Sequence, residues 1–135
     1  MLRRKPAKSD PLQDLSRRER QIMESLYQLG SGSAAQIREL IADPPTYTAI
    51  RTLLTILEEK GHVMHESNGT RYIYSPVVPK AEMREQMMDG LVRTFFDSSI
   101  EQVVSALLKK SEANLSADQL DKLAQLVDEA RRQGR

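Results

Sequence analysis

The feature that most constrains the fold is a predicted β-hairpin that follows directly after three predicted helices. His62–Ser67 and Thr70–Ser75 are the expected strands. Asn68-Gly69 between them is the preferred pair for a type I′ turn, because both central residues of that turn need positive φ. A hairpin in this place is typical of the wing of a winged helix-turn-helix domain. The order of elements therefore predicts a mostly α fold with a small β-hairpin.

The three helices are predicted from signals at their ends. Ser16 with Glu19, and Ser33 with Gln36, form capping boxes, in which each side chain bonds an otherwise unpaired backbone N–H. The expected helices are 17–29, stopped by Gly30; a short helix that opens at Ser33, carries Ile37, Leu40 and Ile41, and is ended by Asp43-Pro44-Pro45; and 47–60, with Thr46 as N-cap and Gly61 as the stop.

The helix over 47–60 has an apolar and a polar face on opposite sides. The apolar stripe is Ile50, Leu53, Leu54 and Leu57, and the polar stripe is Thr48, Arg51, Thr52 and Thr55. The two stripes are offset by two residues, which is a rotation of about 200°. The polar face holds no acid until Glu58 and Glu59. Arginine can pair with guanine O6 and N7, and a threonine methyl can contact the thymine methyl, so this face is predicted to read DNA. An ordinary polar face exposed to solvent is the alternative.

Arg71 near the hairpin tip is a candidate for a phosphate contact. A turn at Asn68-Gly69 would place Glu66 directly opposite Arg71, and Glu66 could then pair with it instead. The predicted DNA-binding residues are Thr46, Tyr47, Thr48, Arg51, Thr52, Thr55 and Arg71.

From Pro79 onward the pattern is entirely helical, and Ser116 with Gln119 caps the last helix. These helices show no evident core of their own, so we expect them to pair with a second copy of the chain; folding back onto the winged helix is the alternative. The expected dimerisation residues are Met83, Met87, Leu91, Phe95, Phe96, Ile100, Val103, Val104, Leu107, Leu120, Leu123 and Leu126. The predicted organisation is a flexible basic arm (1–14), a winged-helix DNA-binding domain (15–78) and a helical dimerisation region (79–135).

Composition and spacing argue against several other classes of protein. The chain has no cysteine, which excludes disulfides and cysteine-ligated metal centres, and its net charge is only +1. The basic residues that could favour nucleic acid gather early, as Arg3, Arg4, Lys5, Lys8, Arg17, Arg18 and Arg20. No apolar run is long enough for membrane insertion, so a cytoplasmic protein is expected. His62 and His65 fall on opposite faces of a strand, so we do not expect them to bind one metal ion together. We expect no cofactor. No catalytic grouping is evident, so we do not expect an enzyme.

Five segments of the chain carry a resemblance to known proteins: "LSRRERQIMESLYQLGSGSAAQIRELI", "TYTAIRTLLTILEEKGHV", "GTRYIYSPVVP", "LVRTFFDSSIEQVVSALL" and "LSADQLDKLAQLV". Together they resemble the penicillinase-repressor (BlaI/MecI/CopY) family of winged-helix transcriptional regulators. The resemblance implies a homodimeric repressor that binds a palindromic double-stranded DNA operator, often that of its own operon. It also implies that helix 47–60 lies in the major groove, with Arg51 and Thr52 facing the operator. Many members respond to a membrane metalloprotease sensor.

Two departures from the family pattern leave the inducing signal open, and a third implies that one contact with the DNA backbone is missing. The Asn-Phe bond that is cut in β-lactam-responsive members aligns near Gly90-Leu91, the C-terminal cysteines of copper-responsive members are absent, and Ile56 stands where many members have arginine. A hypothesis from another class is a winged-helix adaptor that docks on a protein through helices 80–130 and never binds DNA.

Overall fold

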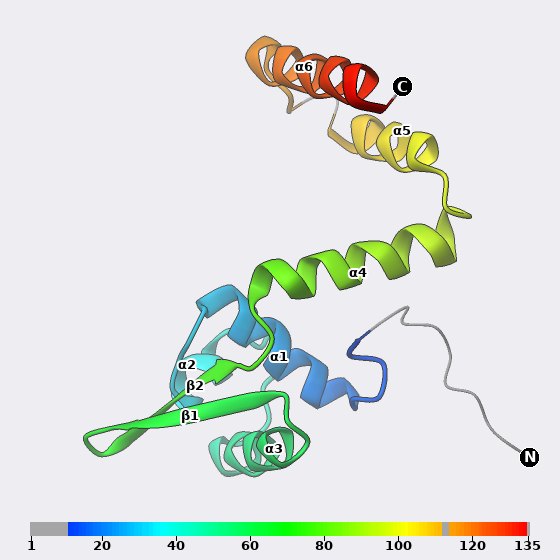
Figure 1. The fold of residues 1–135 in the computed structure, drawn as a ribbon. Coiled ribbons are helices and arrows are strands. Elements are labelled where there is room, and N and C mark those ends of the chain that lie inside the picture. The colour runs from blue at the N-terminus through cyan, green and yellow to red at the C-terminus, as the bar shows by residue number, and fades with distance from the viewer. Residues whose placement is uncertain (1–10, 112–113, 135) are drawn as a thin grey trace, which may run out of the picture.

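The computed structural model describes residues 11–111 and 114–134. Its elements are α1 (Arg17–Leu29), α2 (Ala34–Glu39), α3 (Tyr47–Glu59), β1 (Val63–Asn68), β2 (Arg71–Pro76), α4 (Lys80–Phe95), α5 (Ile100–Ser111) and α6 (Ala117–Gly134). The first three helices and the hairpin form a winged helix, and α4 leads from it to α5 and α6 (Figure 1). The predicted mostly α fold with a small β-hairpin is confirmed.

Side-chain caps start the first three helices where the sequence predicts. The Ser16 hydroxyl accepts from the Glu19 N–H at 3.1 Å, while the Glu19 carboxylate accepts from the Ser16 N–H at 2.8 Å. Ser33 and Gln36 form the same pair of bonds, at 3.2 and 2.8 Å. Thr46 caps α3 by accepting from the Ala49 N–H at 3.1 Å.

The second helix ends earlier than its apolar pattern suggests. It stops at Glu39, and the chain continues in tighter bonds from Leu40 N–H to the Ile37 carbonyl and from Ile41 N–H to the Arg38 carbonyl, both 3.1 Å long. Arg38 then donates to the Pro45 carbonyl at 2.7 Å, which draws the chain toward α3. Leu40 is consequently exposed, although the sequence placed it with the apolar residues of this helix.

The core lies where α1, α2, α3 and the base of the hairpin meet. Its fully buried members include Ile22, Met23, Leu26, Ile37, Ile50, Leu54, Leu57 and Val63. Leu53 is only partly buried against this core. The predicted apolar stripe of α3 is therefore its packing face, and α3 is held with its opposite side outward.

Residues 11–14, predicted as part of a flexible arm, form a turn that packs on the winged helix. Leu12 is 1% exposed, and its carbonyl accepts from the Leu15 N–H at 3.1 Å and from the Arg20 guanidinium at 2.8 Å. A single leucine outside any periodic pattern gives no sign of burial, so the sequence missed it. The basic residues Arg3, Arg4, Lys5 and Lys8 lie outside the described residues.

The hairpin register differs from the one predicted. The pairs are Asn68 with Arg71 and Glu66 with Ile73, so the loop is Gly69-Thr70. Gly69 has φ of 68° and Thr70 has no positive φ, which is the pattern of a type II′ turn. The predicted type I′ turn at Asn68-Gly69 and the pairing of Glu66 with Arg71 are therefore wrong.

A long-range contact accompanies the observed register. Gly32 and Tyr74 exchange backbone hydrogen bonds of 2.9 and 2.8 Å, which ties β2 to the α1–α2 connection. The predicted and observed registers place the same side chains on the same face, because they differ by two residues. The alternation of polar and apolar residues along the strands therefore could not distinguish the two registers.

The last three helices lie mostly away from the winged helix (Figure 1). Only the first part of α4 joins the core, through buried Met83 and partly buried Met87. The predicted cap of α6 is confirmed, because Ser116 and Gln119 exchange bonds of 2.8 and 3.1 Å. Within residues 11–111 and 114–134, no helix is both long and apolar enough to cross a membrane.

Candidate nucleic-acid interface

The outward face of α3 carries the polar stripe predicted from the sequence. Thr48, Arg51, Thr52 and Thr55 are all exposed, whereas Ile50, Leu54 and Leu57 on the other side are fully buried. The Thr55 hydroxyl donates to the Arg51 carbonyl at 3.1 Å, so it is engaged by its own helix. This face is free to approach a partner without any change in the core.

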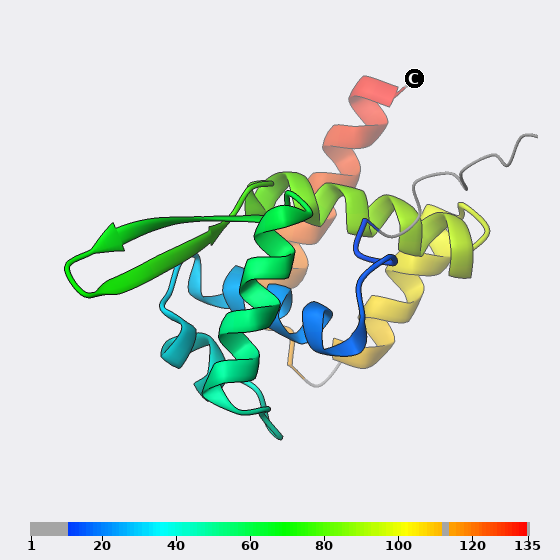
Figure 2. The ribbon, with the colours of Figure 1, turned by 90° about the horizontal axis from the view of Figure 1, so that it is seen from below.

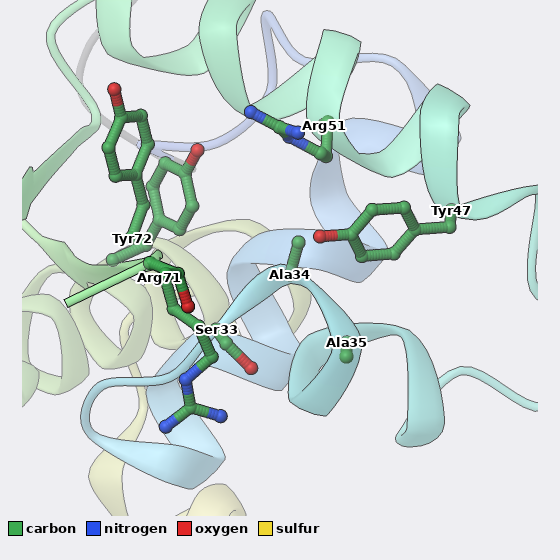
Figure 3. A pocket seen from close by; sticks show the side chains of 9 residues that line it. Ser33, Ala34, Ala35, Tyr47, Arg51, Arg71 and Tyr72 are labelled. Atoms are coloured by element: carbon green, nitrogen blue, oxygen red, sulfur yellow. The ribbon is translucent and has the colours of Figure 1, made fainter. Parts of the chain in front are cut away.

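A pocket of about 270 Å³ opens beside this face, between α2, α3 and the hairpin (Figure 3). Its lining residues are Ser33, Ala34, Ala35, Tyr47, Arg51, Thr70, Arg71, Tyr72 and Tyr74. Three residues predicted to bind DNA, Tyr47, Arg51 and Arg71, thus line one pocket, and the other four, Thr46, Thr48, Thr52 and Thr55, lie outside it. The start of α2 and Tyr72 were missed, since only the packing of α2 beside the hairpin brings them here.

Two of the pocket's residues supply guanidinium groups without an internal partner. Neither Arg51 nor Arg71 bonds or ion-pairs through its side chain with another residue in the part of the chain that the structure describes. Asn68 stands directly opposite Arg71, and Glu66 stands opposite Ile73. Both arginines therefore present unused guanidinium N–H donors to whatever approaches this surface.

Other arginines of the winged helix are used internally. Arg18 donates to the Asp43 carbonyl at 2.6 Å and to Gln21 at 3.0 Å. Arg20 and Arg38 likewise donate to backbone carbonyls, those of Leu12 and Pro45. Of the early basic cluster, Arg18 and Arg20 thus hold loops in place.

The first acid on α3 is turned toward the hairpin. His65 Nδ1 of β1 lies 2.8 and 2.9 Å from the two carboxylate oxygens of Glu58. The His65 ring stacks on Tyr72 with centroids 4.2 Å apart and an interplanar angle of 24°. Among the residues described, no group of three metal-binding side chains comes together, either at His62 and His65 or elsewhere.

The same C-terminal end of α3 is tied to α1 by an ion pair. Lys60 Nζ lies 3.0 Å from the carboxylate of Glu19, which is almost completely buried. Burial raises the pKa of Glu19, but the Ser16 backbone N–H and the Lys60 ammonium outweigh it and leave the pKa below its usual value. On the pocket wall, burial raises the pKa of the Tyr74 hydroxyl, so this group remains a neutral phenol at physiological pH.

The predicted dimerisation residues divide into two groups. Phe95 is 74% exposed, and Ile100 and Leu126 are each 66% exposed. The remaining exposed members are Leu91, Val104, Leu107, Leu120 and Leu123. Met83, Met87, Phe96 and Val103 are instead wholly or partly buried within their own chain. Exposed apolar side chains in such number are typical of surfaces through which proteins associate.

Comparison with known proteins identifies the family. A model of the penicillinase repressor family matches residues 15–129. The penicillinase repressor of Bacillus licheniformis is 20% identical over 117 residues, covering 85% of this chain and 90% of that protein. Among solved structures, the reduced form of MarR from E. coli is 17% identical with a TM-score of 0.49, covering 87% of this chain and 79% of that one. A mutant MarR from E. coli complexed with operator DNA is 16% identical, also with a TM-score of 0.49, covering 87% and 76% of the two chains. Because the family model matches most of its length, the chain belongs to the penicillinase repressor family of transcriptional regulators.

Proposed function

We propose that this regulator is a sequence-specific repressor that binds a palindromic DNA operator as a homodimer, with α3 in the major groove. The observation that carries the proposal is the outward face of α3, which holds no acid before Glu58 and whose Arg51 side chain makes no hydrogen bond or ion pair with any described residue. An unpaired guanidinium can form the bidentate contact with guanine without first breaking a bond inside the protein. Threonines on either side provide methyl and hydroxyl groups of the kind that contact base edges.

The hairpin extends the same surface. Arg71 lies near its tip, where a phosphate contact would position α3 without reading sequence. Residues 15–78, together with the turn at 11–14, would then form the DNA-binding domain. Thr46, Tyr47, Thr48, Thr52 and Thr55 complete the proposed interface around Arg51.

The helices from residue 79 onward would form the dimer. The exposed apolar residues of α4, α5 and α6 would be covered by a second copy, which would place two α3 helices about 34 Å apart, one turn of DNA. Regulation by a membrane metalloprotease sensor is an expectation from the family resemblance. The aligned Gly90-Leu91 bond lies within α4, so cleavage there would require the helix to unwind locally.

Binding to an operator selected from random duplexes tests the proposal. Affinities for the selected and a scrambled duplex are measured by fluorescence anisotropy over a series of salt concentrations. Arg51→Ala is expected to lose about 1–3 kcal/mol of discrimination, because one bidentate base contact is removed. Arg84→Ala, at an exposed position of α4, is the matched control and should bind like the parent.

Equal, weak binding of the parent protein to both duplexes, abolished by modest salt, would indicate phosphate attraction alone. That result would refute the repressor proposal. The exposed apolar surface of α4–α6 would then favour the adaptor, and a protein partner would be sought through it.

A further inference from the structure

The outer half of the hairpin has few contacts with the rest of the chain. At its base, Val63 and Tyr74 are buried, and Gly32 pairs with Tyr74 through two backbone bonds. Toward the tip, Asn68 and Arg71 are exposed, and the hairpin projects away from the helices (Figures 1 and 2). An isolated two-stranded hairpin is at best marginally stable, so the position of the tip depends on the contacts nearest to it.

Level with the Gly32–Tyr74 pairing, on the opposite strand, His65 joins the hairpin to α3. Its Nδ1 bonds both carboxylate oxygens of Glu58. An ionised carboxylate only accepts hydrogen bonds, so we assign the ring proton to Nδ1. On its other side, the His65 ring stacks on Tyr72, which is the residue next to Arg71 in β2.

The register explains why these rings meet. His65 is paired with Tyr74, and Tyr72 is paired with Ser67, so all of them share one face of the hairpin. The His65 ring lies 5.5 Å from that of Tyr74, and the two tyrosine rings lie 6.4 Å apart at 72°. The three rings thus form a continuous aromatic cluster, which Glu58 anchors to α3.

We propose that His65 is a positioning residue of the DNA interface: by linking Glu58 of α3 to Tyr72 of β2, it sets where Arg71 meets the phosphate backbone relative to α3. The proposal rests on the DNA-binding function proposed above and adds to it a residue that the sequence did not indicate. A purely electrostatic role is the alternative, in which His65 only masks the charge of Glu58. The two roles differ in whether the contribution of Arg71 depends on His65.

The test measures the salt dependence of binding to the selected operator. Each phosphate contact adds about 0.9 to the magnitude of the negative slope of log K against log salt concentration. Arg71→Ala should therefore reduce the magnitude of this slope by about 1. His65→Phe retains a ring for stacking but cannot bond Glu58. It should lower the slope to the same extent, and adding Arg71→Ala to it should change the slope little further.

Substitutions on α3 separate positioning from a change in the hairpin itself. Glu58→Gln keeps an oxygen that accepts from Nδ1–H and should retain the parental slope. Glu58→Ala removes the acceptor without altering any residue of the hairpin and should behave like His65→Phe. His62→Phe, at the other histidine near the hairpin base, is the matched control and should have no effect. Thermal unfolding monitored by circular dichroism checks that each variant is folded.

The proposal is overturned if Arg71→Ala lowers the slope equally in the parent and in His65→Phe, because Arg71 would then be placed without His65. It is also overturned if Arg71→Ala leaves the parental slope unchanged. Neither result affects the preference of the parent protein for its selected operator, which is the separate test of the proposed function.

Discussion

Glu19 joins the start of α1 to the end of α3 from a buried position. Its side chain is 6% exposed, and its partner Lys60 at the end of α3 is 43% exposed. One carboxylate oxygen also accepts from the Ser16 N–H at 2.8 Å and so closes the cap of α1. Replacement of Glu19 by glutamine keeps an oxygen for this cap but removes the charge that Lys60 faces.

The expected cost of Glu19→Gln at pH 7 is about 1 kcal/mol of the free energy of unfolding. Hydrogen bonds to charged groups contribute more than neutral ones, but the exposure of Lys60 leaves the pair partly screened by solvent. The difference should depend on pH. Because the pKa of Glu19 in the folded protein lies below its ordinary value of 4.5, ionised Glu19 stabilises the fold. This contribution is complete above pH 4.5 and is lost as the pH falls through the folded pKa.

Urea unfolding followed by circular dichroism, at steps from pH 7 to pH 3, measures this difference. The stabilities of the parent and Glu19→Gln should converge below about pH 4.5. Glu85→Gln, at an exposed position of α4, is the control and should match the parent at pH 7. A gap between parent and Glu19→Gln that stays constant down to pH 3 would show that the charge of Glu19 contributes nothing, and would refute the argument.

Three further substitutions test the packing and the proposed assembly. Leu12→Ala should lower the free energy of unfolding by about 2–3 kcal/mol in urea titrations, because three buried carbons are lost and a cavity remains. Leu40→Ala is the control and should have little effect, because Leu40 is 45% exposed. Equal losses in the two variants would contradict the burial of Leu12. Gly61→Ala should cost about 1–2 kcal/mol in the same assay, because its φ of 87° is strained for any side chain with a Cβ, and an unchanged midpoint would rule this out. Phe95→Glu should shift sedimentation from dimer toward monomer while the winged helix stays folded; an unaltered dimer would place the interface elsewhere.

The elements that the sequence predicted well depend on residues close together in the chain. The caps at Ser16, Ser33, Thr46 and Ser116 involve residues three positions apart, and the stripes of α3 repeat every three or four positions. Hydrogen bonds and helical geometry at this range need no tertiary information. The boundaries of α1 and α3 were therefore predictable nearly to the residue.

Predictions failed where a distant segment decides the local structure. The Asn68-Gly69 pair favours a type I′ turn, yet the turn lies one residue later in a hairpin whose Tyr74 is paired with Gly32. Leu12 lacks a periodic pattern and is buried by the first helix and its neighbours. In both cases the local preference is weaker than the packing and backbone pairing supplied by another part of the chain.

The candidate interface divides in the same way. The sequence by itself determined that Arg51 and its threonines lie opposite the buried stripe, because the helical repeat places residues two apart on opposite sides. Only the tertiary structure decided that Arg71 lines one pocket with Arg51, and that Arg18 and Arg20 bond backbone carbonyls instead. It also brought His65 between Glu58 and Tyr72. These contacts join separate elements, and the angle at which α3 packs against the hairpin comes from the whole core.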